Sequence, residues 1–289
     1  MPHRGLSLLQ AVSLNMSMMV GVGPFITIPA FVATMNGPQA MVGWLVGAIV
    51  AISDGLVWSE LAAAFPGSGG TFHFYDAIYG RSGIGRLLKF LFVWQFLFSG
   101  PLEVATGALG FTLYVSFLIP ALKQTAWSLS GHVPWLGPFT WSVTWSQVLA
   151  VATMAGITAL AYRRIEAAGR LMVVLWVGML LTVGTMIATT LWHFDAGLAF
   201  DFPPDAWRMD SAWAFGLGAA MAIAMYDFLG YYQVCYLGDE VRDPSRVLPR
   251  AIVISVVGIS LIYLSMNLGI LGVLPWRSVI QSNHIASDV

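Results

Sequence analysis

The stretch GVGPFITIP, residues 21–29, lies in the middle of an apolar run that covers residues 6–35. The run is long enough to cross a bilayer as one helix, which needs roughly 20 apolar residues. Its glycines and prolines free backbone groups that lipid cannot satisfy, so such a helix must bury them in protein or expose them to water. Two interpretations remain open. One is a proline kink that lets helices pack closely, and the other is a break at Gly21–Pro24 with a half-helix starting near Phe25.

The composition places the chain in a membrane. It has 289 residues, of which 58% are hydrophobic and 9% are charged. A soluble globular protein carries about 25% charged residues because it must cover its surface with them. The surface of this chain is therefore expected to face a lipid bilayer. The formal net charge of -1 argues against nucleic acid as a partner.

The sequence lacks the common motifs of catalysis. Cys235 is the single cysteine, so it cannot form an internal disulfide, and the five histidines are scattered. There is no Walker loop, no nucleophile elbow and no HExxH zinc motif. The chain is therefore predicted not to be an enzyme and to hold no metal or organic cofactor.

Seven apolar segments qualify as membrane-spanning helices, since only helices satisfy their own backbone in lipid. They lie near residues 7–34, 39–65, 84–119, 146–162, 168–192, 211–237 and 249–274. Lys and Arg concentrate in the loops that would be cytoplasmic if the N-terminus were inside. This predicts a multi-pass cell-membrane protein with a cytoplasmic N-terminus. The loops predicted outside, residues 120–145 and 193–210, carry tryptophans that suit a membrane interface.

A second interrupted helix is indicated by MYDFLGYY, residues 225–232. Asp227 lies deep in an apolar run, and Gly230 follows it closely. An ionisable group at that depth is costly unless it is paired or faces water. It is either part of a functional site or an aspartate hydrogen-bonded to a neighbouring helix. Interrupted first and sixth helices are what an inverted repeat of five helices would produce.

Other carboxylates also fall within predicted spans. Glu103 follows Pro101 in the third span, and it is either a proton-binding or cavity-lining group or a neutral, hydrogen-bonded carboxyl in a helix interface. Asp54, in the second span, is expected to be structural.

Three motifs carry a family resemblance. GVGPF, residues 21–25, is similar to the glycine-rich break, usually GSGIF, in the first helix of amino acid–polyamine–organocation (APC) superfamily permeases. ELAAAFPGSGGTFHFYDAIYG, residues 60–80, and GDEVRDPSRVLPRAI, residues 238–252, resemble that family's segments after the second and sixth helices. Val22 and Pro24 depart from the usual Ser and Ile. The resemblance extends from about residue 7 to the end of the chain.

The resemblance implies an all-α integral membrane protein with the LeuT-type inverted-repeat fold. One transmembrane domain is expected over residues 1–289, with the first repeat at about 7–192 and the start of the second at about 211–274. The family implies about twelve helices, so the fold is expected here as a truncated form of about seven, without the C-terminal part. The implied function is secondary active transport of amino acids or related amines by alternating access. A non-transporting membrane sensor or partner subunit is the alternative, and a channel is least favoured because no filter-like sequence is present.

The resemblance also implies where a substrate would bind. Its carboxylate would meet the amides of Gly21, Val22 and Gly23. Its amino group would meet open carbonyls near Met19 and Val20 and around Ala224, Met225 and Tyr226, with the charge of Asp227 nearby. The coupling ion could be Na⁺, or a proton carried by Asp227 or Glu103. The predicted partners are therefore an amino acid or amine and the lipid bilayer.

The two cytoplasmic motifs are expected to serve architecture or gating. Glu60 and the PGSGG turn, residues 66–70, would form the loop between the second and third spans. Asp239 and Glu240 would face Arg242, Arg246 and Arg250. They form either an inner gate of ion pairs or a solvated loop that caps the seventh helix, with Pro249 near its first turn.

Overall fold

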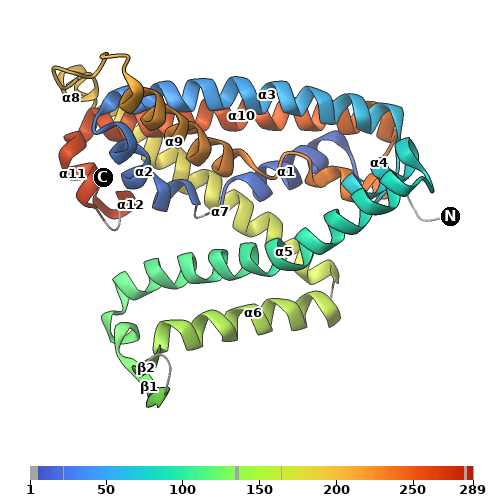
Figure 1. Ribbon diagram of the computed structural model, residues 1–289, viewed down its shortest axis with the longest axis horizontal. Helices are drawn as coiled ribbons and strands as arrows, with labels where there is room; N and C mark the ends of the chain where they lie inside the picture. Colours follow the sequence, from blue (N-terminus) through green and yellow to red (C-terminus); the bar gives the residue numbers. More distant parts are fainter. Residues whose placement is uncertain (1–5, 22, 134–136, 164, 283–284, 289) are drawn as a thin grey trace. The chain divides into compact units, whose positions relative to one another are not determined.

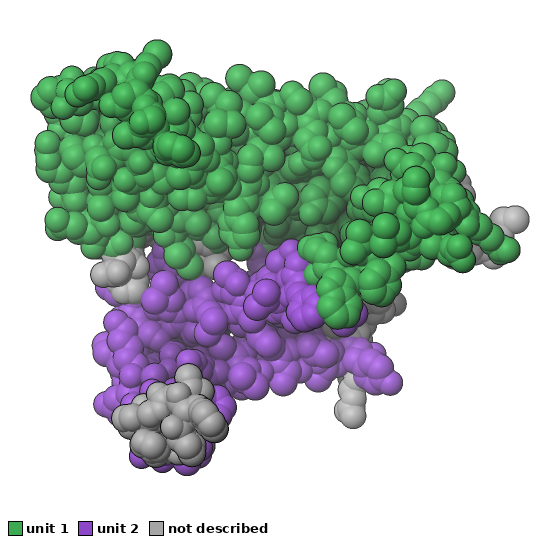
Figure 2. All heavy atoms as spheres, viewed as in Figure 1, with its two compact units in different colours: residues 1–95, 176–289 green, residues 96–175 purple. Residues whose placement is uncertain are grey.

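The computed structural model describes residues 6–21, 23–133, 137–163, 165–282 and 285–288, which are mostly helical (Figure 1). The chain divides into two compact units, residues 1–95 with 176–289 and residues 96–175 (Figure 2). The boundaries fall inside two long helices, α5 (Gly83–Leu118) and α7 (Ile165–Trp192).

The larger unit begins with α1 (Leu8–Met19), α2 (Gly23–Met35), η1 (Pro38–Ala40), α3 (Met41–Ala64) and α4 (Gly70–Tyr79). It also contains α8 (Ala196–Ala199), α9 (Ser211–Phe228), η3 (Gln233–Tyr236), η4 (Gly238–Glu240), α10 (Pro244–Val273), α11 (Trp276–Gln281) and α12 (Ile285–Asp288). Helices α3 and α10 run alongside each other, and α9 packs against both α2 and α3 (Figure 1).

The interrupted first span is present. Ser7 caps α1 in a capping box with Gln10, which fixes where the helix begins. Helix α1 ends at Met19 and α2 begins at Gly23, two residues earlier than expected, with a bend of 49° between the two axes. The bend separates two distinct helices, so the interpretation as a break describes this segment better than a kink within one helix.

Small residues bring α9 close to α3. A Cβ atom built on Gly43 would lie 2.5 Å from that of Ala220, and one on Gly47 would lie 2.8 Å from that of Ala224. Glycine and alanine four residues apart on facing helices allow such close backbone contact, as in many membrane helix pairs. The facing small residues therefore fix where α9 lies along α3.

An aromatic cluster fills the centre of the larger unit. Trp44 is fully buried, and its ring lies 5.4 Å from Phe31, 5.6 Å from Phe228 and 5.3 Å from Tyr263, between ring centroids. The four rings come from α2, α3, α9 and α10. Aromatic pairs at these separations add to the stabilisation from burial, so the cluster ties these four helices together.

Helix α4 is joined to the start of α5 by one ion pair. The Lys89 ammonium donates a hydrogen bond to Asp76, and this contact holds the pKa of the Asp76 carboxyl below its usual range. Lys89 also donates to the carbonyl of Gly80 at 3.2 Å. The connection after α4 is therefore held by a charged contact at the surface.

The smaller unit contains the end of α5, η2 (Pro120–Lys123), α6 (Trp145–Arg163) and the start of α7. A hairpin of two antiparallel strands, β1 (Thr125–Val133) and β2 (Gly137–Thr144), joins η2 to α6 (Figure 1). A loop is predicted over residues 120–145, so the hairpin is an addition to the predicted elements. Its alternating pattern, WSLSG and FTWSV, was a readable signal for strands.

Among the described residues, four helical segments are long and apolar enough to cross a membrane, and the bent pair α1–α2 would make a fifth. The four segments are Pro38–Ala64, Gly83–Leu118, Val174–Trp192 and Pro244–Val273. The predicted fourth and sixth spans do not meet this test: α6 is a shorter apolar helix, and α9 is not among the segments that pass. The expected all-α membrane class is confirmed. Helix α10 begins at Pro244, so Pro249 lies within the helix just after its first turn, close to the expected position.

Candidate functional site

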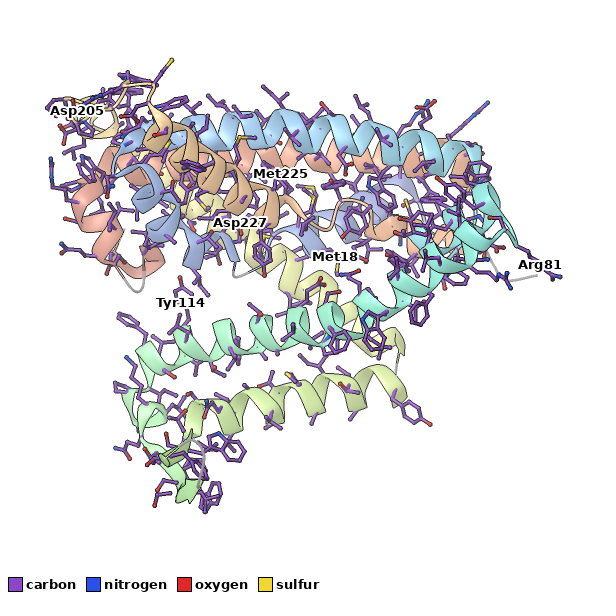
Figure 3. All side chains as sticks on the ribbon, viewed as in Figure 1. Met18, Arg81, Tyr114, Asp205, Met225 and Asp227 are labelled. Atoms are coloured by element: carbon purple, nitrogen blue, oxygen red, sulfur yellow. The ribbon has the colours of Figure 1, made fainter. Side chains whose placement is uncertain are left out.

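Asp227 occupies the last turn of α9, facing α2 (Figure 3). Its side chain is almost completely buried, with 3% of the residue exposed. One carboxylate oxygen, Oδ2, accepts a hydrogen bond from the Thr27 hydroxyl at 2.6 Å. The other oxygen, Oδ1, is buried and has no hydrogen-bond partner in the described part of the chain. A buried polar atom without a partner costs about 1–3 kcal/mol, so this oxygen is a candidate point of contact for a ligand.

The start of α2 lies beside that free oxygen. A Cβ atom on Gly23 would stand 3.0 Å from Asp227 Oδ1, so glycine leaves this space open. Helix geometry leaves the first-turn N–H groups of Gly23 and Phe25 without intrahelical acceptors, and Pro24 has no N–H. The positive end of the α2 dipole stabilises negative charge here. The site therefore combines backbone donors with one carboxylate acceptor.

The backbone at the end of α1 is less open than expected. The Met19 carbonyl accepts hydrogen bonds from the Tyr263 hydroxyl at 2.8 Å and from the Gly21 amide at 3.1 Å. These two contacts occupy both lone pairs of the oxygen. The Met19 carbonyl is therefore not open as expected and the Gly21 amide already has an acceptor, while their contact with a substrate stays a prediction. Val20 is buried and its amide donates to Met16 at 2.9 Å, while Val22 lies outside the described residues.

The interruption after α9 falls later than predicted. Ala224, Met225, Tyr226 and Asp227 are all helical, and the chain leaves the helix at Leu229. In an α-helix the carbonyl of Ala224 accepts the amide four residues later, so the prediction that it is open is wrong. The Tyr226 carbonyl accepts from the Leu229 amide at 3.2 Å. The open carbonyl expected at Met225 stays a prediction, and Asp227 Oδ1 is the side-chain acceptor that this group offers in the described residues.

A buried asparagine, which is not among the predicted site residues, holds the interruption in place. Asn15 of α1 is fully buried; its Nδ2 donates to the Tyr231 carbonyl at 2.6 Å, and its Oδ1 accepts from the Val234 amide at 2.9 Å. The Tyr231 hydroxyl donates to Asp54, which agrees with the structural role expected for that carboxylate. The sequence signal that could have identified Asn15 is an amide side chain within a predominantly apolar helix.

One tyrosine connects the ends of both interrupted helices. The hydroxyl of Tyr263, from α10, contacts the carbonyl of Met19 at 2.8 Å and that of Asp227 at 3.3 Å. A hydroxyl has one proton to donate, so the shorter contact is the stronger bond and the longer one shares its proton. Tyr263 therefore links the C-terminal ends of α1 and α9 at the candidate site.

Glu103 lies in the smaller unit, where α5 runs without interruption through Pro101. Its side chain is exposed. Its predicted role in proton coupling or as a cavity wall stays a prediction. Glu60 lies on the exposed side of α3, within the helix, so the prediction that it belongs to the following loop is wrong.

The motif after α9 contacts the loop after α3. The Ser68 amide donates to the Asp239 carboxylate at 3.3 Å, and the Asp239 amide donates to the Ser68 hydroxyl at 2.9 Å. A Cβ atom on Gly238 would lie 2.1 Å from the Gly67 carbonyl oxygen. Glycine at position 238 therefore allows close backbone contact with the PGSGG turn, as an architectural role requires.

The ion pairs of the inner-gate alternative are not formed among the residues that the structure describes. Within the part of the chain that the structure describes, Asp239 and Glu240 make no ion pair with an arginine; Arg246 pairs instead with Asp243, at 3.8 Å. The Asp239 carboxylate instead accepts a hydrogen bond from the Ser68 amide. The Leu6 amide donates to the Glu240 carbonyl, and the Arg242 amide donates to the Leu6 carbonyl, both at 3.0 Å. This loop therefore also holds the segment just before α1.

Comparisons with known proteins agree with the motifs. A family model described as amino acid permease matches residues 6–287. A protein of Mycobacterium tuberculosis, described as an uncharacterized transporter, is 30% identical over 94% of this chain and 53% of its own length. The serine/threonine exchanger of Bacillus subtilis is 24% identical over 98% of this chain and 58% of its own length. The mouse Asc-type amino acid transporter 1 is 26% identical over 97% and 50%.

The chain spans about half the length of the curated relatives it matches. Those relatives are named as transporters and exchangers rather than enzymes. The family model covers nearly the whole chain and includes all three motifs on which the resemblance rests. The chain belongs to the amino acid permease family.

Proposed function

We propose that this chain functions in secondary transport of amino acids or related amines across the cell membrane, by alternating access. The family match, the LeuT-type fold that the family implies and the names of the relatives support this proposal. In such folds the substrate binds near the bilayer midplane between two interrupted helices. The corresponding elements here are α1–α2 and the end of α9.

The observation that carries the proposal is the free carboxylate oxygen of Asp227. It is buried beside the start of α2 without a hydrogen-bond donor in the described residues. A substrate ammonium group supplies both a donor and a compensating positive charge. Hydrogen bonds to charged groups contribute about 1.5–3 kcal/mol, which favours amine-bearing substrates over neutral isosteres.

The carboxylate of an amino acid would be recognised from the other side. The N–H groups of Gly23 and Phe25 at the start of α2 are suitable donors, and the helix dipole adds positive potential. This revises the expected donor set: Gly23 remains in it, and the Gly21 amide leaves it because Met19 accepts its hydrogen bond.

The coupling of substrate transport to a proton or Na⁺ is part of the same proposal. Asp227 is the acid best placed to carry a proton or to contact Na⁺, because it is buried at the interrupted helices. Glu103 is the second candidate for a proton-binding group. Binding measured across pH and sodium concentration in wild type and in Asp227→Asn distinguishes these sources, since a proton site on Asp227 requires the pH dependence to disappear in the variant.

The deciding experiment is equilibrium binding of labelled serine, leucine, arginine and putrescine to the purified chain in lipid nanodiscs. We expect saturable binding of at least one amine-bearing compound, weakened about 10- to 100-fold in Asp227→Asn because a charged hydrogen bond is lost. Asp205→Asn is the matched control, since Asp205 is an exposed loop residue (Figure 3). Equal affinities in wild type and Asp227→Asn would show that Asp227 is structural, and no saturable binding of any compound would contradict the proposed function.

A further inference from the structure

The hairpin of the smaller unit has two chemically different faces. Side chains alternate between the faces of a strand, so the register assigns each residue to one side. One face, called the aromatic face, carries the cross-strand pairs Trp127–Val143, Leu129–Trp141 and Gly131–Phe139. The other, called the hydroxyl face, carries Ser128–Ser142 and Ser130–Thr140.

Ring contacts confirm that the aromatic side chains share a face. Trp127 and Trp141, which are diagonal neighbours in the register, have ring centroids 6.2 Å apart at 78°. The ring of Phe139 covers Gly131, where a Cβ atom would lie 2.8 Å from it. These contacts hold the rings in place across the two strands.

The aromatic face is nevertheless largely uncovered. The exposed fractions are 52% for Trp127, 45% for Leu129 and 61% for Trp141. Burying apolar surface is favourable by about 25 cal/mol per Å², and a two-stranded hairpin is marginally stable on its own in water. This face therefore gains stability from a partner that accepts apolar rings.

The position of the hairpin indicates which partner that is. It begins just after α5, whose last residue Leu118 is 77% exposed, and it ends directly at Trp145, the first residue of α6. Both helices are apolar, and both expose apolar side chains such as Phe117 and Val151. The hairpin is therefore flanked in the sequence by two apolar helices whose exposed side chains suit a lipid environment.

The charge pattern fits a bilayer surface. Residues 104–162 contain no Asp or Glu, and Lys123 is their single Lys or Arg. No carboxylate would approach anionic headgroups, and Lys123 beside the hairpin would be attracted to them. Tryptophan prefers the headgroup level of a bilayer because its ring is apolar and its N–H is polar.

We propose that the hairpin β1–β2 is an interfacial membrane anchor: its aromatic face lies in the headgroup region of the bilayer and its hydroxyl face lies in water. The anchor would fix the level of the α5–α6 connection at the bilayer surface. This role is independent of substrate binding at Asp227.

Neighbouring residues on opposite faces provide the test. Leu129→Cys and Ser130→Cys, and likewise Trp141→Cys and Ser142→Cys, are made in a Cys235→Ala background, spin-labelled and reconstituted in vesicles of phosphatidylethanolamine and phosphatidylglycerol. Collision rates are measured with oxygen, which concentrates in lipid, and with a water-soluble nickel chelate. We expect labels at 129 and 141 to favour oxygen and labels at 130 and 142 to favour nickel.

Two results would overturn the proposal. Similar preference for nickel on both faces would place the hairpin in water. Protection of positions 129 and 141 from both reagents would show that protein covers the face, whether another part of the molecule or a second copy. If Trp141→Cys does not reconstitute, the pair Leu129→Cys and Ser130→Cys decides alone, because Ser130→Cys leaves every aromatic ring in place.

Discussion

The two interruptions in the larger unit are built differently. At the first, between α1 and α2, Gly21 is exposed, and the amides that begin α2 have no intrahelical acceptors. At the second, after α9, Tyr231, Val234 and Cys235 are almost completely buried. Asn15 forms hydrogen bonds with the Tyr231 carbonyl and the Val234 amide of this segment. Consecutive turns supply hydrogen bonds to other backbone groups of the segment.

The difference separates architecture from binding. Where the protein itself supplies the hydrogen bonds, an interrupted helix is a stable structural element, and changes there should reduce stability. Where donors and an acceptor remain without partners, the interruption can bind a ligand, and changes should reduce affinity. The interruption between α1 and α2, together with the Asp227 side chain, is of the kind that can bind a ligand. Four variants test this distinction.

Asn15→Leu should have the largest effect on stability. It removes the partners of the Tyr231 carbonyl and the Val234 amide, and each buried unsatisfied group costs about 1–3 kcal/mol, so the loss is about 2–6 kcal/mol. The measurement is thermal unfolding in detergent followed by size-exclusion chromatography. Ser13→Ala, on the exposed side of α1, is the control. An unchanged melting temperature for Asn15→Leu would mean that the second interruption does not depend on Asn15.

Gly230→Ala should destabilise the same interruption by about 1–3 kcal/mol, the cost of a residue held in an unfavourable backbone conformation. Gly230 has a φ of +121°, and a Cβ atom there would lie 3.0 Å from the Met18 carbonyl carbon. Gly218→Ala is the matched control, because no atom lies within 4 Å of a Cβ at that helical position. Opposite shifts in melting temperature are expected, since alanine stabilises a helix interior relative to glycine.

Tyr263→Phe removes the hydroxyl that joins both interruptions. We expect a loss of about 0.5–1.5 kcal/mol for one hydrogen bond, together with weaker substrate binding because the ends of α1 and α9 are no longer linked. Tyr162→Phe, at an exposed position, is the control. A loss of stability with unchanged affinity would place Tyr263 with the architectural interruption alone.

Gly23→Leu should change stability least and binding most. Its side chain would fill the space beside Asp227 Oδ1, so substrate binding in nanodiscs should disappear while the melting temperature stays near that of wild type. Gly21→Ala is the control, since the nearest atom to a Cβ there lies 3.9 Å away. Normal binding by Gly23→Leu would show that the first interruption is architectural too.

Much of this arrangement could be predicted from the sequence. The interruption at Gly21 and the unusual position of Asp227 followed from glycine, proline and one acid in apolar runs, because lipid makes such residues costly. The hairpin could have been predicted from its alternation of apolar and hydroxyl residues.

Other features could not be predicted from local patterns. Asn15 bonds residues 216 and 219 positions away, and no short-range pattern reports such a contact. The exact end of α9 was misplaced because Asp227 interrupts the apolar pattern before the helix itself ends. The contact of Asp239 with Ser68, 171 positions away, likewise forms only when the chain folds back on itself.

The close contact of Gly43 and Gly47 with Ala220 and Ala224 also limits how the molecule can move. Longer side chains can change rotamer and let one helix slide past another, but a glycine surface facing alanine methyl groups has no such freedom. Sliding α9 along α3 would require a shift of a whole turn, about 5.4 Å, to bring small residues opposite one another again. The two helices are therefore expected to travel as a single rigid body, and the hinge of any rocking motion must lie outside this pair.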